Sequence, residues 1–169
     1  MAKIYTQTGD GGTTALWDGT RVPKDDPHIE TNGALDELNA AIGLAKSFAD
    51  RSMKEELDSL QGELVSLMSY VARGRKPQTP PAPEALERWI DRTLSEYPME
   101  RLFVNPGETQ TGAALHLARA IARRAERAAL PIRTRSGGDV EENAYRYINR
   151  LSDLLFALAH KADSLGSGS

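Results

Sequence analysis

The sequence of 169 residues contains no cysteine. This absence excludes disulfides, thiolate metal sites and a cysteine nucleophile, and it fits a reducing compartment. The chain also lacks a basic excess, because its formal net charge at pH 7 is −3, which disfavours a general nucleic-acid binder. No apolar run approaches the roughly 18 residues of a membrane-spanning helix, and the first ten residues lack the apolar core of a signal peptide. We therefore expect a cytoplasmic protein that has neither a membrane segment nor nucleic acid as a partner.

The composition that remains is typical of one globular domain. Apolar residues make up 40% of the chain and charged residues 27%, and the length suffices for a single sizeable core. The last residues, LGSGS, are typical of a flexible tail. We expect one domain over residues 1–163 and a tail over residues 164–169.

Apolar residues recur at helical spacing in five segments. The first two helices are expected from about Thr31, with Thr31 or Asn32 as the cap, to Ala49, and from Met53 to Arg73. Three more are expected after Pro83, from about Thr109 to Ala129, and from about Val140 to Ala162. Strands are expected only at residues 3–6 and 102–104. The predicted fold class is all-α, a five-helix bundle with an N-terminal loop rich in glycine and threonine.

The N-terminal loop, TQTGDGGTT over residues 6–14, allows two interpretations. Glycines let backbone N–H groups converge on an anion, and threonine hydroxyls add donors, so the loop suits a phosphate. The alternative is a hairpin turn on Asp10 and Gly11, a common turn dipeptide. The spacing is not that of a P-loop, and the residues by themselves favour the turn.

The segment RAIARRAER over residues 119–127 is the second candidate. Helical geometry places Arg119, Arg123 and Glu126 within one third of the circumference. A solvated face with pairs such as Arg123–Glu126 is one interpretation. The other is recognition of phosphate or carboxylate, because the segment uses arginine and no lysine, and because its remaining surface is apolar enough for a central helix.

A third candidate is NRLSD, in which Asn149, Arg150 and Asp153 interrupt an apolar helix. Such polar groups need hydrogen bonds, either in a network between helices or to a ligand. The three histidines lack metal-ligand spacing, and His116 is expected to be a satisfied structural residue. The sequence shows no recognisable catalytic triad and no pair of carboxylates spaced for acid–base catalysis.

Five segments occur in one order: TQTGDGGTT, then Lys24-Asp25-Asp26, GALDELNAAIGLA from residue 33, RAIARRAER and NRLSDLLFALA. Together, over about residues 3–161, they resemble the ATP:cob(I)alamin adenosyltransferases of the propanediol-utilisation type. The resemblance implies a homotrimer with an active site at each subunit interface. It also implies transfer of the 5′-deoxyadenosyl group of ATP to the cobalt of reduced cobalamin, with release of tripolyphosphate. Mg²⁺ would assist the departing phosphates, and a reductase would supply electrons.

The same resemblance assigns roles to individual residues. Arg123, Asn149 and Phe103 would be catalytic, with Phe103 against the lower face of the corrin. Asp36 and Arg119 would form an ion pair across the subunit interface. The residues that would bind ATP are Thr6, Gln7, Thr8, Gly9, Thr14, Lys24, Arg123, Arg124, Glu126, Arg127 and Asn149. The ligands of Mg²⁺ are not indicated.

Two positions depart from the family pattern. Gln7 stands where many relatives have a basic residue, and Glu108 follows Gly107 where a small residue is usual. These departures motivate an alternative function, a carrier that binds ATP and delivers cobalamin without catalysis. A purely structural trimeric bundle is a third hypothesis.

Overall fold

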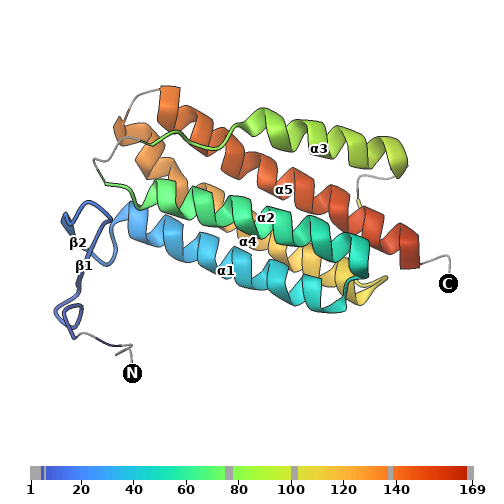
Figure 1. Ribbon diagram of the computed structural model, residues 1–169, viewed down its shortest axis with the longest axis horizontal. Coiled ribbons are helices and arrows are strands. Elements are labelled where there is room, and N and C mark those ends of the chain that lie inside the picture. Colours follow the sequence, from blue (N-terminus) through green and yellow to red (C-terminus); the bar gives the residue numbers. More distant parts are fainter. Residues whose placement is uncertain (1–4, 6, 75–77, 100–102, 137–138, 167–169) are drawn as a thin grey trace.

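The computed structural model describes residues 5, 7–74, 78–99, 103–136 and 139–166, and it shows a bundle of five helices with a small hairpin at one end (Figure 1). The helices are α1 (Pro27–Phe48), α2 (Arg51–Val71), α3 (Pro83–Glu96), α4 (Gln110–Ser136) and α5 (Asp139–Gly166). The strands are β1 (Thr13–Ala15) and β2 (Arg21–Pro23), which pair antiparallel. The predicted fold class is therefore confirmed.

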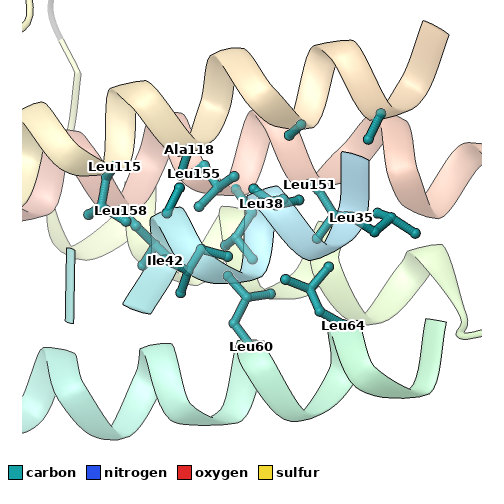
Figure 2. Close-up of a cluster of buried hydrophobic side chains, with 14 of the residues drawn as sticks. Leu35, Leu38, Ile42, Leu60, Leu64, Leu115, Ala118, Leu151, Leu155 and Leu158 are labelled. Atoms are coloured by element: carbon teal, nitrogen blue, oxygen red, sulfur yellow. The ribbon is translucent and has the colours of Figure 1, made fainter. Parts of the chain in front are cut away.

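The core lies between α1, α2, α4 and α5, and α3 covers α5 from outside (Figure 1). Figure 2 shows leucines of α1 and α2 meeting Leu115 and Ala118 of α4 and three leucines of α5. In α2 the leucines that recur at helical spacing, Leu57, Leu60, Leu64 and Leu67, are all fully buried. The contact between α4 and its neighbours uses small residues, Ala114, Ala118, Ala122, Ala125 and Ala129, all at least nine-tenths buried. The expectation that the arginine-bearing helix is central is confirmed.

The first helix begins four residues before the expected start. Asp26 is its N-cap and accepts a 2.9 Å hydrogen bond from the backbone N–H of His28, and Pro27 occupies the first turn. Both are strong start signals, because the cap satisfies a free N–H and proline lacks one. Thr31 is instead fully buried within the helix, so the cap assigned to Thr31 or Asn32 was wrong.

The last two helices are longer than expected. Helix α4 continues through Pro131 to Ser136, because Ala129 and Ile132 on either side of the proline pack on the core. Helix α5 continues to Gly166, so the first three residues of the expected tail are helical, while residues 167–169 lie outside the described residues.

The hairpin is also placed differently from the prediction. Its connection runs through Leu16–Thr20, where Gly19 has φ +87° and Leu16 N–H donates to the Thr20 carbonyl at 2.9 Å. Asp10 and Gly11 lie in a turn that precedes β1 and do not form the hairpin turn itself. Phe103 and Val104 adopt no regular structure, so the strand expected at 102–104 is absent from its described part. In the other expected strand, only Tyr5 is described, and it too has no regular structure.

Candidate functional site

Strand β2 and the residue that follows it place two cations, Arg21 and Lys24, against the glycine-rich loop that precedes β1. Arg21 donates from Nη2 to the Thr8 carbonyl at 2.9 Å and also to the hydroxyl of Thr13. A Cβ placed on Gly9 would lie 3.3 Å from Nζ of Lys24, so the ammonium group closely approaches the loop backbone. The Lys24 N–H donates to the Gly12 carbonyl at 2.9 Å and extends the hairpin ladder. The structure thus brings together Thr8, Gly9 and Lys24, three of the residues to which the family resemblance assigns ATP.

Two loop residues have left-handed backbone conformations. Gly12 has φ +78°, which glycine adopts without a steric penalty, and Gln7 has φ +62°, which is uncommon for other residues. Such conformations concentrate at functional sites, where surrounding contacts hold them. Gln7 and Thr8 are exposed and Thr14 is half-buried, while Thr6 lies outside the described residues.

A second group of polar residues joins α4 to α5. Asn149 donates from Nδ2 to Oε1 of Glu126 at 2.8 Å, and the hydroxyl of Tyr145 reaches the same oxygen at 3.3 Å. Burial raises the pKa of Tyr145, and the charge of Glu126 raises it further, so the phenol stays protonated and remains a donor. Asn149 and Glu126, two of the residues predicted to bind ATP, are therefore hydrogen-bonded to each other, so the Asn149 amide N–H has a partner within the chain.

The network continues from Asn149 toward α3. Arg150 donates to the Asn149 amide oxygen at 3.0 Å and to Glu87 at 2.9 Å. Asp153 follows on the same surface, 3.7 Å from Arg150. Its pKa is raised by desolvation, while Arg150 and the exposed Arg123 oppose the shift. The arginine, glutamate, asparagine and aspartate of α4 and α5 thus form one polar surface.

The other arginines of α4 point elsewhere. Arg124 pairs with Glu37 of α1, whereas Arg127 is exposed. Arg119 is half-buried, and its guanidinium carbon lies 5.7 Å from the centroid of the Phe156 ring. Its Nε has no hydrogen-bond partner among the described residues, and neither Arg119 nor the exposed Asp36 forms an ion pair within the described part of the chain. Both charges therefore remain available to another chain.

His116 lies one turn before Arg119 and is only 4% exposed. Neither ring nitrogen has a hydrogen-bond partner in the described structure, so the expectation of a satisfied histidine was wrong for the single chain. Burial lowers the pKa of His116, the charge of Arg119 lowers it further, and Asp163 partly offsets both effects. The ring is 5.8 Å from that of Phe156, so His116 and Arg119 share one aromatic neighbour.

Phe103 precedes α4 and is 95% exposed, an unusual state for so large an apolar side chain. It borders a hollow that Val104 and Asn105 also line, with His160 and Ser164 of α5 on the other side. The hollow lies at the start of α4, where α5 ends.

These groups are spread along the bundle. The hairpin lies at the end where α1 begins, and α4 begins at the opposite end (Figure 1). At 1.5 Å per residue, the 27 residues of α4 span roughly 40 Å, and Arg123 lies near their midpoint. One chain therefore does not bring the glycine-rich loop, the arginine helix and Phe103 to a common point.

Two features of the site escaped the sequence analysis. Arg21 fixes the loop, and it was missed because no strand was expected at residues 13–15 or 21–23, whose pairing carries Arg21 to the loop. Tyr145 completes the contact with Glu126, at the spacing of four residues before Asn149 that places both on one helix face.

No metal site emerges from the described side chains. Among them, no group of three or more histidine, aspartate or glutamate residues is arranged to hold a metal ion. Nor does any helix, as far as the chain is described, have the length and apolar character needed to cross a membrane.

The sequence profile of cobalamin adenosyltransferases matches residues 4–162 of the chain. The corrinoid adenosyltransferase PduO of Citrobacter freundii is 41% identical over 170 residues, which cover 95% of this chain and 50% of that protein. The corrinoid adenosyltransferase MMAB of Mus musculus is 38% identical, over 96% of this chain and 73% of its own length. The chain thus spans about half the length of the bacterial PduO relatives that it matches.

Solved structures give the same result. A variant of the PduO-type ATP:corrinoid adenosyltransferase from Lactobacillus reuteri, complexed with cobalamin and ATP, superposes with a TM-score of 0.84. It is 33% identical, and the match covers 98% of this chain and 93% of that one.

Proposed function

The chain belongs to the cobalamin adenosyltransferase family, and on that premise we propose that it transfers the 5′-deoxyadenosyl group of ATP to the cobalt of reduced cobalamin. The products are adenosylcobalamin and tripolyphosphate. The observation that carries the proposal is the convergence of Lys24 and Arg21 on the glycine-rich loop, which suits a triphosphate. Relatives and structural neighbours that are named as transferases favour this function over the carrier.

The chemistry needs no nucleophile from the protein. Cobalt(I) is itself a strong nucleophile that attacks C5′ of the ribose, and the C5′–O bond to the triphosphate breaks. The protein has to hold the two reactants in line, which by itself lowers the barrier by several kcal/mol. It also has to stabilise the charge that develops on the leaving triphosphate, and the exposed Arg123 with Lys24 suits that role.

We propose a homotrimer in which the loop of one chain meets α4 and α5 of its neighbour. The separation of the hairpin from Arg123 and Phe103 within one chain supports this arrangement. Asp36 and Arg119, which lack ion-pair partners among the described residues, would pair across the interface. The loop would contribute residues 6–9, Thr14 and Lys24, and the neighbour would contribute Arg123, Arg124, Glu126, Arg127 and Asn149.

We assign the corrin to the hollow beside Phe103. The exposed phenyl ring would cover the lower face of the corrin and exclude the lower axial ligand. Four-coordinate cobalt(II) is easier to reduce, so the ring would raise the reduction potential of the metal.

The remaining partners follow from this reaction. Mg²⁺ usually keeps several waters and binds through substrate phosphates, so the triphosphate of ATP would supply its main ligands. A reductase would supply the electron that cobalt(II) needs, and we propose the cytoplasm as the location.

The test is an assay with ATP, Mg²⁺ and chemically reduced cobalamin, followed by absorbance of the light-sensitive cobalt–carbon product and by release of tripolyphosphate. We expect both products in equal amounts. Tight binding of cobalamin and ATP without either product would establish the carrier. Failure to bind ATP in calorimetry would leave only the structural bundle.

A further inference from the structure

We propose that the groove between α2 and α3 binds a small oxyanion, a carboxylate or a phosphate group. The groove has a volume of about 490 Å³. One wall carries Glu55, Glu56 and Glu63 of α2, and the other carries Arg88, Trp89 and Arg92 of α3. This volume lies in the range of sites for small molecules.

The acidic wall is already occupied by partners within the chain. Glu55 pairs with Arg51 at 3.3 Å, and Glu56 receives two hydrogen bonds of 2.9 Å from the buried Lys161. Glu63 accepts a hydrogen bond from the hydroxyl of Tyr147. Each of the three carboxylates thus has a partner within the chain, and the cation that holds Glu56 is buried.

The opposite wall has only unused donors. Arg88 and Arg92 are exposed, lie four residues apart on one face of α3, and form no ion pair within the described part of the chain. Trp89 between them is 9% exposed, and its Nε1 is buried with no hydrogen-bond partner among the described residues. A buried N–H without an acceptor costs free energy. A ligand oxygen that reaches it after a small side-chain adjustment would satisfy it.

The lining itself carries three carboxylates and two guanidinium groups, a net charge of −1. Arg51 and Lys161, outside the lining, pair with Glu55 and Glu56, so Glu63 is the one carboxylate of the lining that opposes Arg88 and Arg92 without a cationic partner among the described residues. Two guanidinium groups at a spacing of four residues can clamp one oxyanion from both sides. None of these residues belongs to the proposed ATP or corrin site.

The chain offers a direct probe, because it has only two tryptophans, Trp17 and Trp89. Their indole N–H signals in a nitrogen-15 correlation spectrum can be assigned with the variant W17F. The protein is titrated separately with inorganic phosphate and with succinate at constant ionic strength. We expect the Trp89 signal to move saturably, with a midpoint below about 10 mM.

Paired variants make the result specific. In R88Q/R92Q the midpoint should rise by at least about tenfold, while any response of Trp17 stays unchanged. The control K54Q alters an exposed lysine of α2 outside the groove lining and should leave the midpoint unchanged. A response to phosphate alone assigns a phosphorylated ligand, and a response to succinate alone assigns a carboxylate. The proposal would be overturned if the chemical shift of the Trp89 indole N–H stayed unchanged in both titrations, or if the midpoint in R88Q/R92Q were unaltered.

Discussion

Nδ2 of Asn149 lies 2.8 Å from Oε1 of Glu126, and this hydrogen bond fixes α5 against α4 at the polar surface beside Arg123. The asparagine and the glutamate have each other as partners before any nucleotide arrives. Arg123, in contrast, is exposed and contributes chiefly charge to that surface. The two kinds of residue should therefore respond differently to substitution.

Arg123→Ala should abolish most of the turnover without unfolding the protein. We expect kcat to fall by about 100-fold or more, since a donor to the leaving phosphates is lost. The free energy of unfolding should change by less than about 0.5 kcal/mol, as for an exposed residue. Steady-state kinetics and urea unfolding measure both. Full activity in the variant would remove Arg123 from the site, and Lys54→Ala serves as the exposed control.

Arg119→Ala should disturb assembly rather than chemistry. The half-buried guanidinium and the exposed Asp36 have no ion-pair partner among the described residues, so each should lose about 2 kcal/mol or more of interface energy when truncated. Analytical ultracentrifugation would show dissociation of the trimer in Arg119→Ala and in Asp36→Ala. The charge swap D36R/R119D should restore part of the association. A trimeric, fully active Arg119→Ala would contradict the pairing.

Phe103→Ala should lower activity mainly when cobalt(II) is the starting state. The ring is 95% exposed, so its removal should leave stability unchanged, while the proposed cover of the corrin is lost. We expect a decrease of at least about tenfold from cobalt(II), which corresponds to 1.4 kcal/mol. The decrease should be smaller when cobalt(I) is supplied. Equal loss in both assays would assign Phe103 to binding alone.

Gly112→Ala should destabilise the bundle where α4 meets the end of α5. A Cβ at this position would lie 1.9 Å from a carboxylate oxygen of Asp163, which accepts hydrogen bonds from the N–H and hydroxyl of Thr109. The carboxylate must move, and we expect a loss of about 1–3 kcal/mol in urea unfolding. Gly62→Ala is the matched control, because a Cβ at Gly62 meets nothing within 4 Å. This substitution should increase the free energy of unfolding by as much as about 1 kcal/mol, since alanine favours the helix more than glycine does.

The free energy of unfolding should decrease as the pH is lowered through the range where His116 takes up a proton in the unfolded chain. Burial and Arg119 lower the pKa of His116 below 6.5, so just below that value the unfolded chain binds a proton that the folded chain does not. The free energy of unfolding should therefore decrease as the pH falls through 6.5. Urea unfolding at about pH 7.5 and about pH 5.5 should show a smaller decrease in His116→Gln. An identical decrease in both proteins would assign the effect to other groups.

Repeating apolar patterns predicted the bundle well, because a long helix repeats its apolar spacing over several turns, and single exceptions do not hide it. Leu57, Leu60, Leu64 and Leu67 are all fully buried, as their spacing indicated. The motifs shared with the adenosyltransferases predicted the family. The prediction of the bundle and the prediction of the family each rest on a pattern that many residues share.

Single positions were harder to predict. Apolar spacing in helix α3 favours an inward face of Leu86, Ile90, Leu94 and Tyr97, and Leu86 is indeed fully buried. Trp89 and Thr93 are also buried, whereas Ile90, Leu94 and Tyr97 are only partly buried, because the orientation of the helix depends on how it packs against α5. Pro131 was expected beyond the fourth helix, yet burial of Ala129 and Ile132 offsets the lost backbone hydrogen bond. The distance between the loop and the arginine helix depends on the lengths of whole helices, which no local motif encodes.

The row of alanines through α4 bears on how such a chain tolerates changes of length. Ala118, Ala122 and Ala125 are fully buried and set the angular position of each arginine relative to the neighbouring helices. One inserted residue would turn everything after it by about 100° and exchange buried alanines for arginines. Insertions and deletions should therefore accumulate in the proline-rich stretch between α2 and α3 and be selected against inside α4.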